Sequence, residues 1–233
     1  MYKKLSVLIP VYNEKDTIKA CVERVLDADI SDLELEIIIS DNNSYDGTKE
    51  ILNSFTDKRI KILFRDSNGG KGANIKNALK NSTGDLILFQ DGDLEYSPSD
   101  FKSLLEPFFL YNADVVYGSR LTRAKATSIV GFPNYIANHL VTFLTNLLYN
   151  KIFTDIATGY KVFKNNIIKE MEITSDGFEI EPEITAKLSK NKKIKIFEVP
   201  ITINSRSYDE GKKVRWWNFF TYLYHLIKWR FVN

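Results

Sequence analysis

The sequence predicts an α/β fold in which a mostly parallel sheet is flanked by helices. Short β-branched runs alternate with helical patterns through the first half of the 233 residues, as in chains whose parallel strands are joined by crossover helices. These runs are nearly continuous in apolar residues, which is expected of strands that are covered on both faces. The length suits one domain, so we expect residues 1–233 to form a single unit.

The positions of the expected elements follow from the spacing of the apolar residues. Strands are expected at 5–10, 35–40, 60–64, 85–90 and 113–117, and helices at 15–28, 47–55, 72–81 and 99–110. The second half is less regular, with a long helix at 133–150 and a helix at 182–189 before a strand at 193–201. An amphipathic helix is expected at about 215–232.

The composition excludes several classes of protein. The 32 basic and 30 acidic residues give a net charge of +2, so no strong field favours nucleic acid as a partner. Cys21 is the only cysteine and lies in an apolar helical pattern, so we expect a buried helix residue and no disulfide. The N-terminus runs directly into a strand-like segment, which favours a cytoplasmic location. No run reaches the roughly 18 apolar residues that a membrane span needs.

The segment Gln90-Asp91-Gly92-Asp93 follows a strand-like apolar run and is the first candidate for chemistry. Two carboxylates one residue apart raise each other's pKa, and a hard divalent ion bound by their oxygens removes that cost. Gly92 lets the backbone turn and a ligand approach. Asp-Gly is also a common turn dipeptide, so a plain turn with two solvated aspartates is the alternative.

Further polar loops follow the other strand-like runs. Asn68-Gly69-Gly70-Lys71-Gly72 opens a helix, where N–H groups and Lys71 would attract a phosphate, and a plain strand-to-helix turn is the alternative. Asp41-Asn42-Asn43-Ser44 offers acceptors suited to a ribose or a base edge, and we expect Asp46 to cap the next helix. Ligands of open α/β sheets bind beyond the carboxyl ends of the strands, so these loops should share one cleft with Pro10-Val11-Tyr12-Asn13-Glu14.

The order and spacing of these motifs resemble the family 2 glycosyltransferases. The match continues through Gly118-Ser119-Arg120, Asp155-x-x-x-Gly159-Tyr160-Lys161, Gly177-Phe178-Glu179-Ile180-Glu181 and Glu198-Val199-Pro200-Ile201, and it ends with the segment from Arg206 to Lys213. Each piece is common, whereas the ordered set is specific and covers nearly the whole chain. Within the family, the chain looks most like the dolichyl-phosphate mannose synthases and other polyprenyl-phosphate sugar synthases.

The resemblance implies an A-type glycosyltransferase fold and an inverting, metal-dependent transfer of a hexose. The donor would be a nucleotide-sugar of the GDP-mannose or UDP-glucose type, and the acceptor a polyprenyl or dolichyl phosphate. The resemblance places a set of loop residues at the donor: Pro10, Tyr12, Glu14, Asp41, Asn43, Lys71, Asp91, Gly92, Arg206 and Lys212. Mg²⁺ or Mn²⁺ would be held by Asp91, Asp93 and Glu95, and the acceptor phosphate would be faced by Arg120 and Ser119. The catalytic candidates are Asp93, Asp155 and Arg206.

Three carboxylates each have a functional and a structural interpretation. A phosphate acceptor is already ionised near neutral pH, whereas a hydroxyl acceptor would need a carboxylate to take its proton. Asp155 is the candidate for that base, and an ion pair within the fold is its structural alternative. Glu179 and Glu181 lie before a helix, where acids favour the dipole, so structural and functional roles stay open for both.

The final helix bears on where the protein acts. Its Trp and Tyr residues, together with Lys and Arg, suit a helix lying in a membrane interface, so we expect peripheral association with the cytoplasmic face of a membrane. Packing against the sheet, a homodimer contact and a membrane-protein partner are the alternatives. Two other functions also stay open, namely transfer to a glycan hydroxyl and a non-catalytic subunit that binds a nucleotide-sugar.

Overall fold

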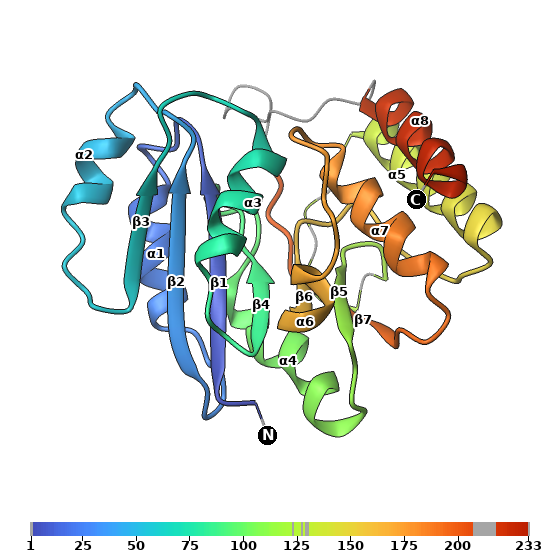
Figure 1. Cartoon of the computed structure of the whole chain (residues 1–233), viewed down its shortest axis with the longest axis horizontal. Coiled ribbons are helices and arrows are strands. Elements are labelled where there is room, and N and C mark those ends of the chain that lie inside the picture. The colour runs from blue at the N-terminus through green and yellow to red at the C-terminus, as the bar shows by residue number, and fades with distance from the viewer. Residues whose placement is uncertain (1, 123, 127, 129–130, 207–217, 233) are drawn as a thin grey trace.

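The computed structural model describes residues 2–122, 124–126, 128, 131–206 and 218–232. Its centre is a seven-stranded sheet with the strand order β3-β2-β1-β4-β6-β5-β7 (Figure 1). β1 (Lys4–Val11), β2 (Glu34–Asp41), β3 (Ile60–Phe64) and β4 (Leu86–Phe89) are parallel, and β5 (Val115–Ser119) is parallel to β7 (Ile196–Pro200). β6 (Lys161–Lys164) lies between β4 and β5 and is antiparallel to both. The expectation of a mostly parallel sheet is confirmed.

The helices lie close to where the sequence predicts them. They are α1 (Ile18–Leu26), α2 (Thr48–Asn53), α3 (Lys71–Asn81), α4 (Phe101–Leu110, after a 3₁₀ turn at Pro98–Asp100), α5 (Phe132–Tyr149), α6 (Asn165–Lys169), α7 (Ile180–Lys190) and α8 (Asn218–Phe231). The short elements β6 and α6 were not expected. No helix in the described part of the chain combines the length and the apolar character needed to cross a membrane.

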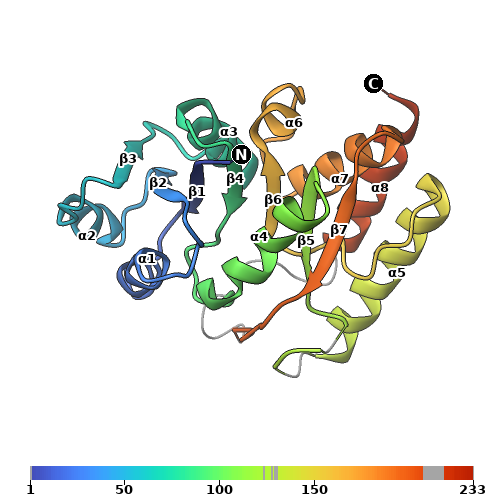
Figure 2. The ribbon, with the colours of Figure 1, turned by 90° about the horizontal axis from the view of Figure 1, so that it is seen from below.

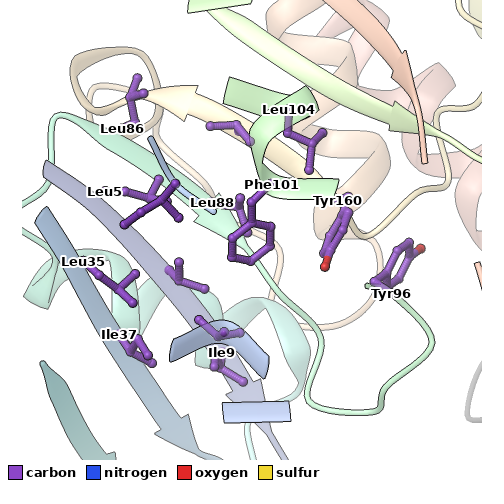
Figure 3. Close-up of a cluster of buried hydrophobic side chains, with 14 of the residues drawn as sticks. Leu5, Ile9, Leu35, Ile37, Leu86, Leu88, Tyr96, Phe101, Leu104 and Tyr160 are labelled. Atoms are coloured by element: carbon purple, nitrogen blue, oxygen red, sulfur yellow. The ribbon is translucent and has the colours of Figure 1, made fainter. Parts of the chain in front are cut away.

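Two apolar clusters hold the helices on the two faces of the sheet. Alternate residues of a strand point to opposite faces, so Leu5 and Ile9 of β1 join the cluster that α1 and α4 cover, whereas Leu8 joins the one that α3 and α7 cover. Figure 2 shows α1 and α4 on one side of the sheet and α3, α6 and α7 on the other. In Figure 3, side chains of β1, β2 and β4 meet Phe101 and Leu104 of α4.

The edge strand β3 departs from the expectation that every strand is covered on both faces. Its five residues are half-buried or exposed, because β3 pairs only with β2 and packs weakly against helices. By contrast, the four residues of β4 are all buried. The strands that precede the carboxylate loops therefore form the rigid centre of the sheet, and this centre positions the site.

Candidate active site

The loops after β1, β2 and β4 and the loop before α3 converge on one cleft of about 490 Å³, as the sequence predicts. This volume lies within the usual range for small-molecule sites, roughly 300–1,000 Å³. From the first half of the chain the cleft is lined by Pro10, Tyr12, Glu14, Asn42, Asn68, Lys71, Asp91, Gly92, Asp93 and Glu95. The second half supplies the opposite wall, which includes Arg120, Glu181, Arg206 and residues of α5 and α8.

Asp91 and Asp93 follow the buried strand β4 and are each paired with a cation. The Nζ atom of Lys71 lies 2.8 Å from Oδ1 of Asp91, and Nη2 of Arg206 lies 3.0 Å from Oδ2 of Asp93. Burial raises the pKa of Asp93 to about 6, and the negative charges of Asp91 and Glu95 add to this effect. The carboxylates are therefore crowded, and additional positive charge would stabilise them.

The carboxylates fit a divalent cation of the hard, oxygen-binding kind. Among the described residues no three His, Cys, Asp or Glu side chains are grouped to hold a metal by themselves. Mg²⁺ is commonly held by only one or two carboxylates, together with substrate phosphates and waters, so Asp91 and Asp93 suffice. Glu95 is less available, because its Oε1 accepts a hydrogen bond from the backbone N–H of Arg206 at 3.0 Å.

Arg206 is the last residue of the described segment 131–206, and its side chain contacts the carboxylates that follow β1 and β4. Besides Asp93, its guanidinium contacts Glu14, with Nη1 at 3.2 Å from Oε2. Burial lowers the pKa of Arg206, but the charges of Asp93 and Glu14 outweigh it, so the pKa lies above its ordinary value. A permanent cation thus lies between Asp93 and Glu14. Lys212, which was expected beside Arg206 at the diphosphate, lies outside the described residues.

Lys71 makes different contacts from those expected of a phosphate ligand. Its Nζ lies between Asp91 and Glu181, 3.3 Å from Oε1 of the latter. Glu181 also pairs with Lys161, whose side chain is fully buried. The four side chains form a row of alternating charges, Asp91, Lys71, Glu181 and Lys161, that runs from the cleft into the core. These two carboxylates take up part of the donor capacity of Lys71 that a bound phosphate would otherwise use.

The two glutamates whose roles the sequence leaves open take different positions. Glu181 lines the cleft and pairs with two lysines, which favours a role at the site. Glu179 instead accepts a hydrogen bond from the N–H of Gly177 at 2.9 Å and shapes the turn before α7. The role of Lys161 was missed, since a lysine within a short strand carries no sign in the sequence of being buried.

Asp155 forms an ion pair with Arg120 inside the fold. Its Oδ2 lies 2.6 Å from Nε of Arg120, its Oδ1 lies 2.7 Å from Nη2, and its Oδ2 also accepts from the backbone N–H at 3.1 Å. Burial raises the pKa of Asp155, but Arg120 outweighs burial and holds the pKa below its ordinary value. Asp155 is buried and does not line the cleft, so its placement corrects the expectation of a catalytic base and matches the structural alternative.

The two residues expected at the acceptor phosphate have different positions. Arg120 lines the cleft, although its guanidinium is bound to Asp155. Ser119 is buried, and its hydroxyl lies 2.6 Å from Oγ1 of Thr154, which corrects the expectation that it faces the acceptor. Ser119 is the last residue of β5 and its side chain points into the protein, whereas Arg120 follows the strand and reaches the cleft.

The nucleoside end of the cleft is built partly by residues that were not expected there. Asp41 is buried beneath it and accepts a hydrogen bond from the N–H of Ser44 at 3.0 Å, and Asn43 accepts one from Lys49 at 2.8 Å. Neither of them lines the cleft, which corrects both expectations, and their neighbour Asn42 does. Asp46 has a structural role, since it accepts a bond from the N–H of Thr48 at the start of α2, but the N-cap position itself is occupied by Gly47.

Gly159 and Asn74 were also missed as contributors to the site. A Cβ atom at Gly159 would collide with Oδ2 of Asp91 and crowd the ring of Tyr96, so glycine leaves room for that carboxylate in its present position. The side-chain amide of Asn74 donates to the carbonyl groups of Val11 and Ser40, and so ties the ends of β1 and β2 together below the cleft. A polar residue on the buried side of the first turn of α3 was the signal for Asn74 in the sequence.

Comparisons with known proteins agree with this geometry. The sequence model described as Glycosyl transferase family 2 matches residues 6–171. Dolichol-phosphate mannosyltransferase from Pyrococcus furiosus is 28% identical over 232 residues, which cover 97% of this chain and 64% of that protein. Glycosyltransferase AglJ from Haloferax volcanii is 28% identical over 201 residues, which cover 86% of this chain and 63% of that protein. The chain thus spans less than two thirds of the length of these two relatives.

Solved structures provide the comparison of folds. Glucosyl-3-phosphoglycerate synthase from Mycobacterium tuberculosis, in complex with Mn²⁺, UDP and phosphoglyceric acid, is similar with a TM-score of 0.73 and 17% identity. The match covers 99% of this chain and 80% of that one. Another complex of the same enzyme contains Mn²⁺, UDP-glucose and phosphoglyceric acid. The fold is therefore the A-type glycosyltransferase fold.

Proposed function

The chain belongs to glycosyl transferase family 2, and we propose that it transfers a hexose from a nucleotide-diphospho-sugar to a polyprenyl or dolichyl phosphate, with inversion at the anomeric carbon. The observation that carries this proposal is the single cleft in which Asp91 and Asp93 face Arg206 and Arg120. It offers charges for a diphosphate and for a second phosphate. The likeness to the mannosyltransferase supports the acceptor, and the UDP and UDP-glucose complexes of the synthase support the donor class.

The donor is proposed to lie along the ends of β1, β2 and β4. Pro10, Tyr12 and Glu14 would hold its nucleoside with Asn42, while Asp41 and Asn43 support the loop from below. Arg206, Lys71 and Lys212 would face the diphosphate, and Gly92 would let the donor approach the backbone. A GDP-mannose or a UDP-glucose type of donor fits a site of this chemistry equally well.

Mg²⁺ or Mn²⁺ would be held by Asp91 and Asp93, with Glu95 able to join once it releases the N–H of Arg206. Such an ion, when bound, neutralises negative charge on the diphosphate as the leaving group departs. The complexes of the synthase with Mn²⁺ or Mg²⁺ and UDP support this cofactor.

The reaction needs no proton transfer when the acceptor is a phosphate. An acceptor oxygen forms the new bond to the anomeric carbon, and the bond from that carbon to the diphosphate oxygen breaks, with its electron pair leaving on the nucleoside diphosphate. Arg206 stabilises the charge that develops on the leaving group, and Arg120 contributes positive charge at the acceptor end of the cleft. Asp155, the base that a hydroxyl acceptor would require, is bound to Arg120, and this favours a phosphate over a glycan hydroxyl.

The proposed enzyme is one catalytic domain of residues 1–233 that acts in the cytoplasm, at the membrane that holds its lipid acceptor. A non-catalytic nucleotide-sugar-binding subunit is the competing function. The enzyme is favoured because one cleft holds both a donor side and an acceptor side. Asp91, Asp93 and Arg206 form the donor side and Arg120 the acceptor side, which a binding subunit would not need.

The test is a panel of GDP- and UDP-sugars incubated with a short polyprenyl phosphate, with lipid-linked sugar as the product measured. We expect one donor class to give product in the presence of Mn²⁺ or Mg²⁺ and none after chelation. Tight donor binding without product or donor hydrolysis would identify the binding subunit. Sugar transferred to a glycan and never to the lipid phosphate would refute the acceptor.

A further inference from the structure

Helices α5 and α8 lie side by side at one end of the molecule (Figures 1 and 2). The hydroxyl of Tyr149 in α5 donates to the carbonyl of Leu226 in α8 at 2.7 Å, and Nε of Arg230 donates to the carbonyl of Leu148 at 3.1 Å. The inner sides of both helices line the cleft, through residues such as Asn138 of α5 and Tyr222 of α8. The pair therefore forms a wall with the proposed site on its inner side.

The outer sides of the same helices expose large apolar residues in regular rows. The row on α5 consists of Phe132, Ile136, Leu140, Phe143 and Leu147, and the row on α8 consists of Phe220, Tyr224, Ile227 and Phe231. Intervals of three or four residues keep each row on one face of its helix, opposite the side that lines the cleft. Phe143 is 61% exposed, Leu147 69% and Phe231 81%, which is unusual for side chains of this size.

The charged residues of the two helices themselves are of one sign. The sequence contains no Asp or Glu between Asp114 and Asp155, and none from residue 211 to the end, although the whole chain holds 30 of them. Lys151 follows α5, and Lys228 and Arg230 lie in the last turns of α8. At the end of α7, Lys190 donates to the carbonyl of Val232, which follows α8. Lys192 and Lys193, two and three residues further along the chain, are exposed. An apolar face with a cationic rim complements a surface that is apolar inside and anionic outside.

We infer that the outer faces of α5 and α8 together form a docking surface for a bilayer that contains anionic lipids. Aromatic and aliphatic side chains enter the boundary between headgroups and acyl chains, while the lysines and arginines contact lipid phosphates. The absence of acids across both helices favours this occupant over a second protein, whose surface would be mixed in charge. The inference rests on the proposed function in one respect, the lipid acceptor. Docking would bring the wall of the cleft to the membrane that holds this acceptor.

Flotation of the purified full chain with vesicles tests the docking surface. We expect the protein to float with vesicles of phosphatidylcholine and phosphatidylglycerol, and to float far less with phosphatidylcholine alone or at high salt. The double variants Phe143→Gln/Leu147→Gln on α5 and Phe220→Gln/Phe231→Gln on α8 should each lower the partition coefficient at least about tenfold. The matched control is Leu110→Gln, which is also 61% exposed but lies on α4 at the opposite face of the sheet, and it should float like the wild type.

The inference is overturned if the wild-type protein stays unbound with both kinds of vesicle, or if both double variants float as well as it does. A wild-type dimer that these variants split, with no flotation, would show that a second copy covers the surface. Two readouts separate this failure from that of the proposed function. Asp93→Asn should float normally while losing turnover, and the double variants should keep turnover with a short acceptor in solution while losing it with an acceptor embedded in vesicles.

Discussion

The ion pair between Asp155 and Arg120 should contribute measurably to the free energy of unfolding, and its contacts indicate how much. The substitution Asp155→Asn keeps the shape of the side chain and removes its charge. It weakens two charge-assisted hydrogen bonds, at 2.6 and 2.7 Å, and leaves the cation of Arg120 next to a neutral group in a buried place. Removing one partner of a buried pair costs about 3–5 kcal/mol. We expect the free energy of unfolding to fall by that amount at pH 7.

Urea unfolding at several pH values measures this loss. With a slope of about 2–3 kcal/mol per molar urea, the midpoint should fall by roughly 1–2.5 M. The pKa of Asp155 is lower in the folded protein than in the unfolded chain, so its contribution is present above the unfolded pKa of about 3.9 and is lost as the pH falls through the folded value. The difference between variant and wild type should therefore be full at neutral pH and shrink only below about pH 4.

Turnover distinguishes the ion pair from a catalytic base. Loss of a general base costs about 100- to 10,000-fold in rate, whereas folded Asp155→Asn should stay within about tenfold of wild type with a phosphate acceptor. Asp29→Asn is the matched control, because Asp29 pairs with Lys102 on the surface and its loss should leave the midpoint unchanged. An unfolding midpoint equal to that of wild type, combined with abolished turnover, would refute the structural role.

Three further predictions concern the carboxylate side of the cleft. Asp93→Asn should reduce lipid-linked sugar by at least about a thousandfold at an unchanged melting temperature, and measurable product with the same metal dependence would contradict the assignment. Arg206→Ala should lower kcat by about 100- to 1,000-fold, with partial recovery in Arg206→Lys, and steady-state kinetics showing a change in KM alone would argue against leaving-group stabilisation. Gly159→Ala should displace Asp91 and cost about 1–3 kcal/mol of stability along with activity, so a fully active and stable variant would show that the carboxylate has another place to go.

The sequence was sufficient to predict the parallel part of the fold and the convergence of the carboxylate loops. Apolar runs such as 5–10 and 85–90 reveal buried strands directly, and the rule that ligands bind at strand ends then brings Asp91 and Lys71 together. Partner choice could not be predicted in the same way. Lys71 pairs with Glu181 and Arg120 with Asp155 across long stretches of chain, and no local pattern encodes these contacts.

The strand β6 was missed for a related reason. It is four residues long and begins with Lys161, so its sequence has neither the length nor the apolar run that indicates a buried strand. The lysine is tolerated there because Glu181 of α7 neutralises it. The burial of a lysine such as Lys161 can be predicted from the sequence only when its acidic partner is known.

The reversed direction of β6 determines how the second half of the chain reaches the chemistry. In the parallel strands, residues that leave the strand reach the cleft, whereas in β6 it is the incoming residues, Gly159 among them, that arrive at the tip of β4. Pairing opposes Val162 to Leu88, and a slip of one position would exchange the faces of Val162 and Lys161. Lys161 would then lose Glu181 and present its charge to the apolar cluster beneath α4. The ion pair between Lys161 and Glu181 thus determines the register of β6, which is too short for its apolar residues alone to do so.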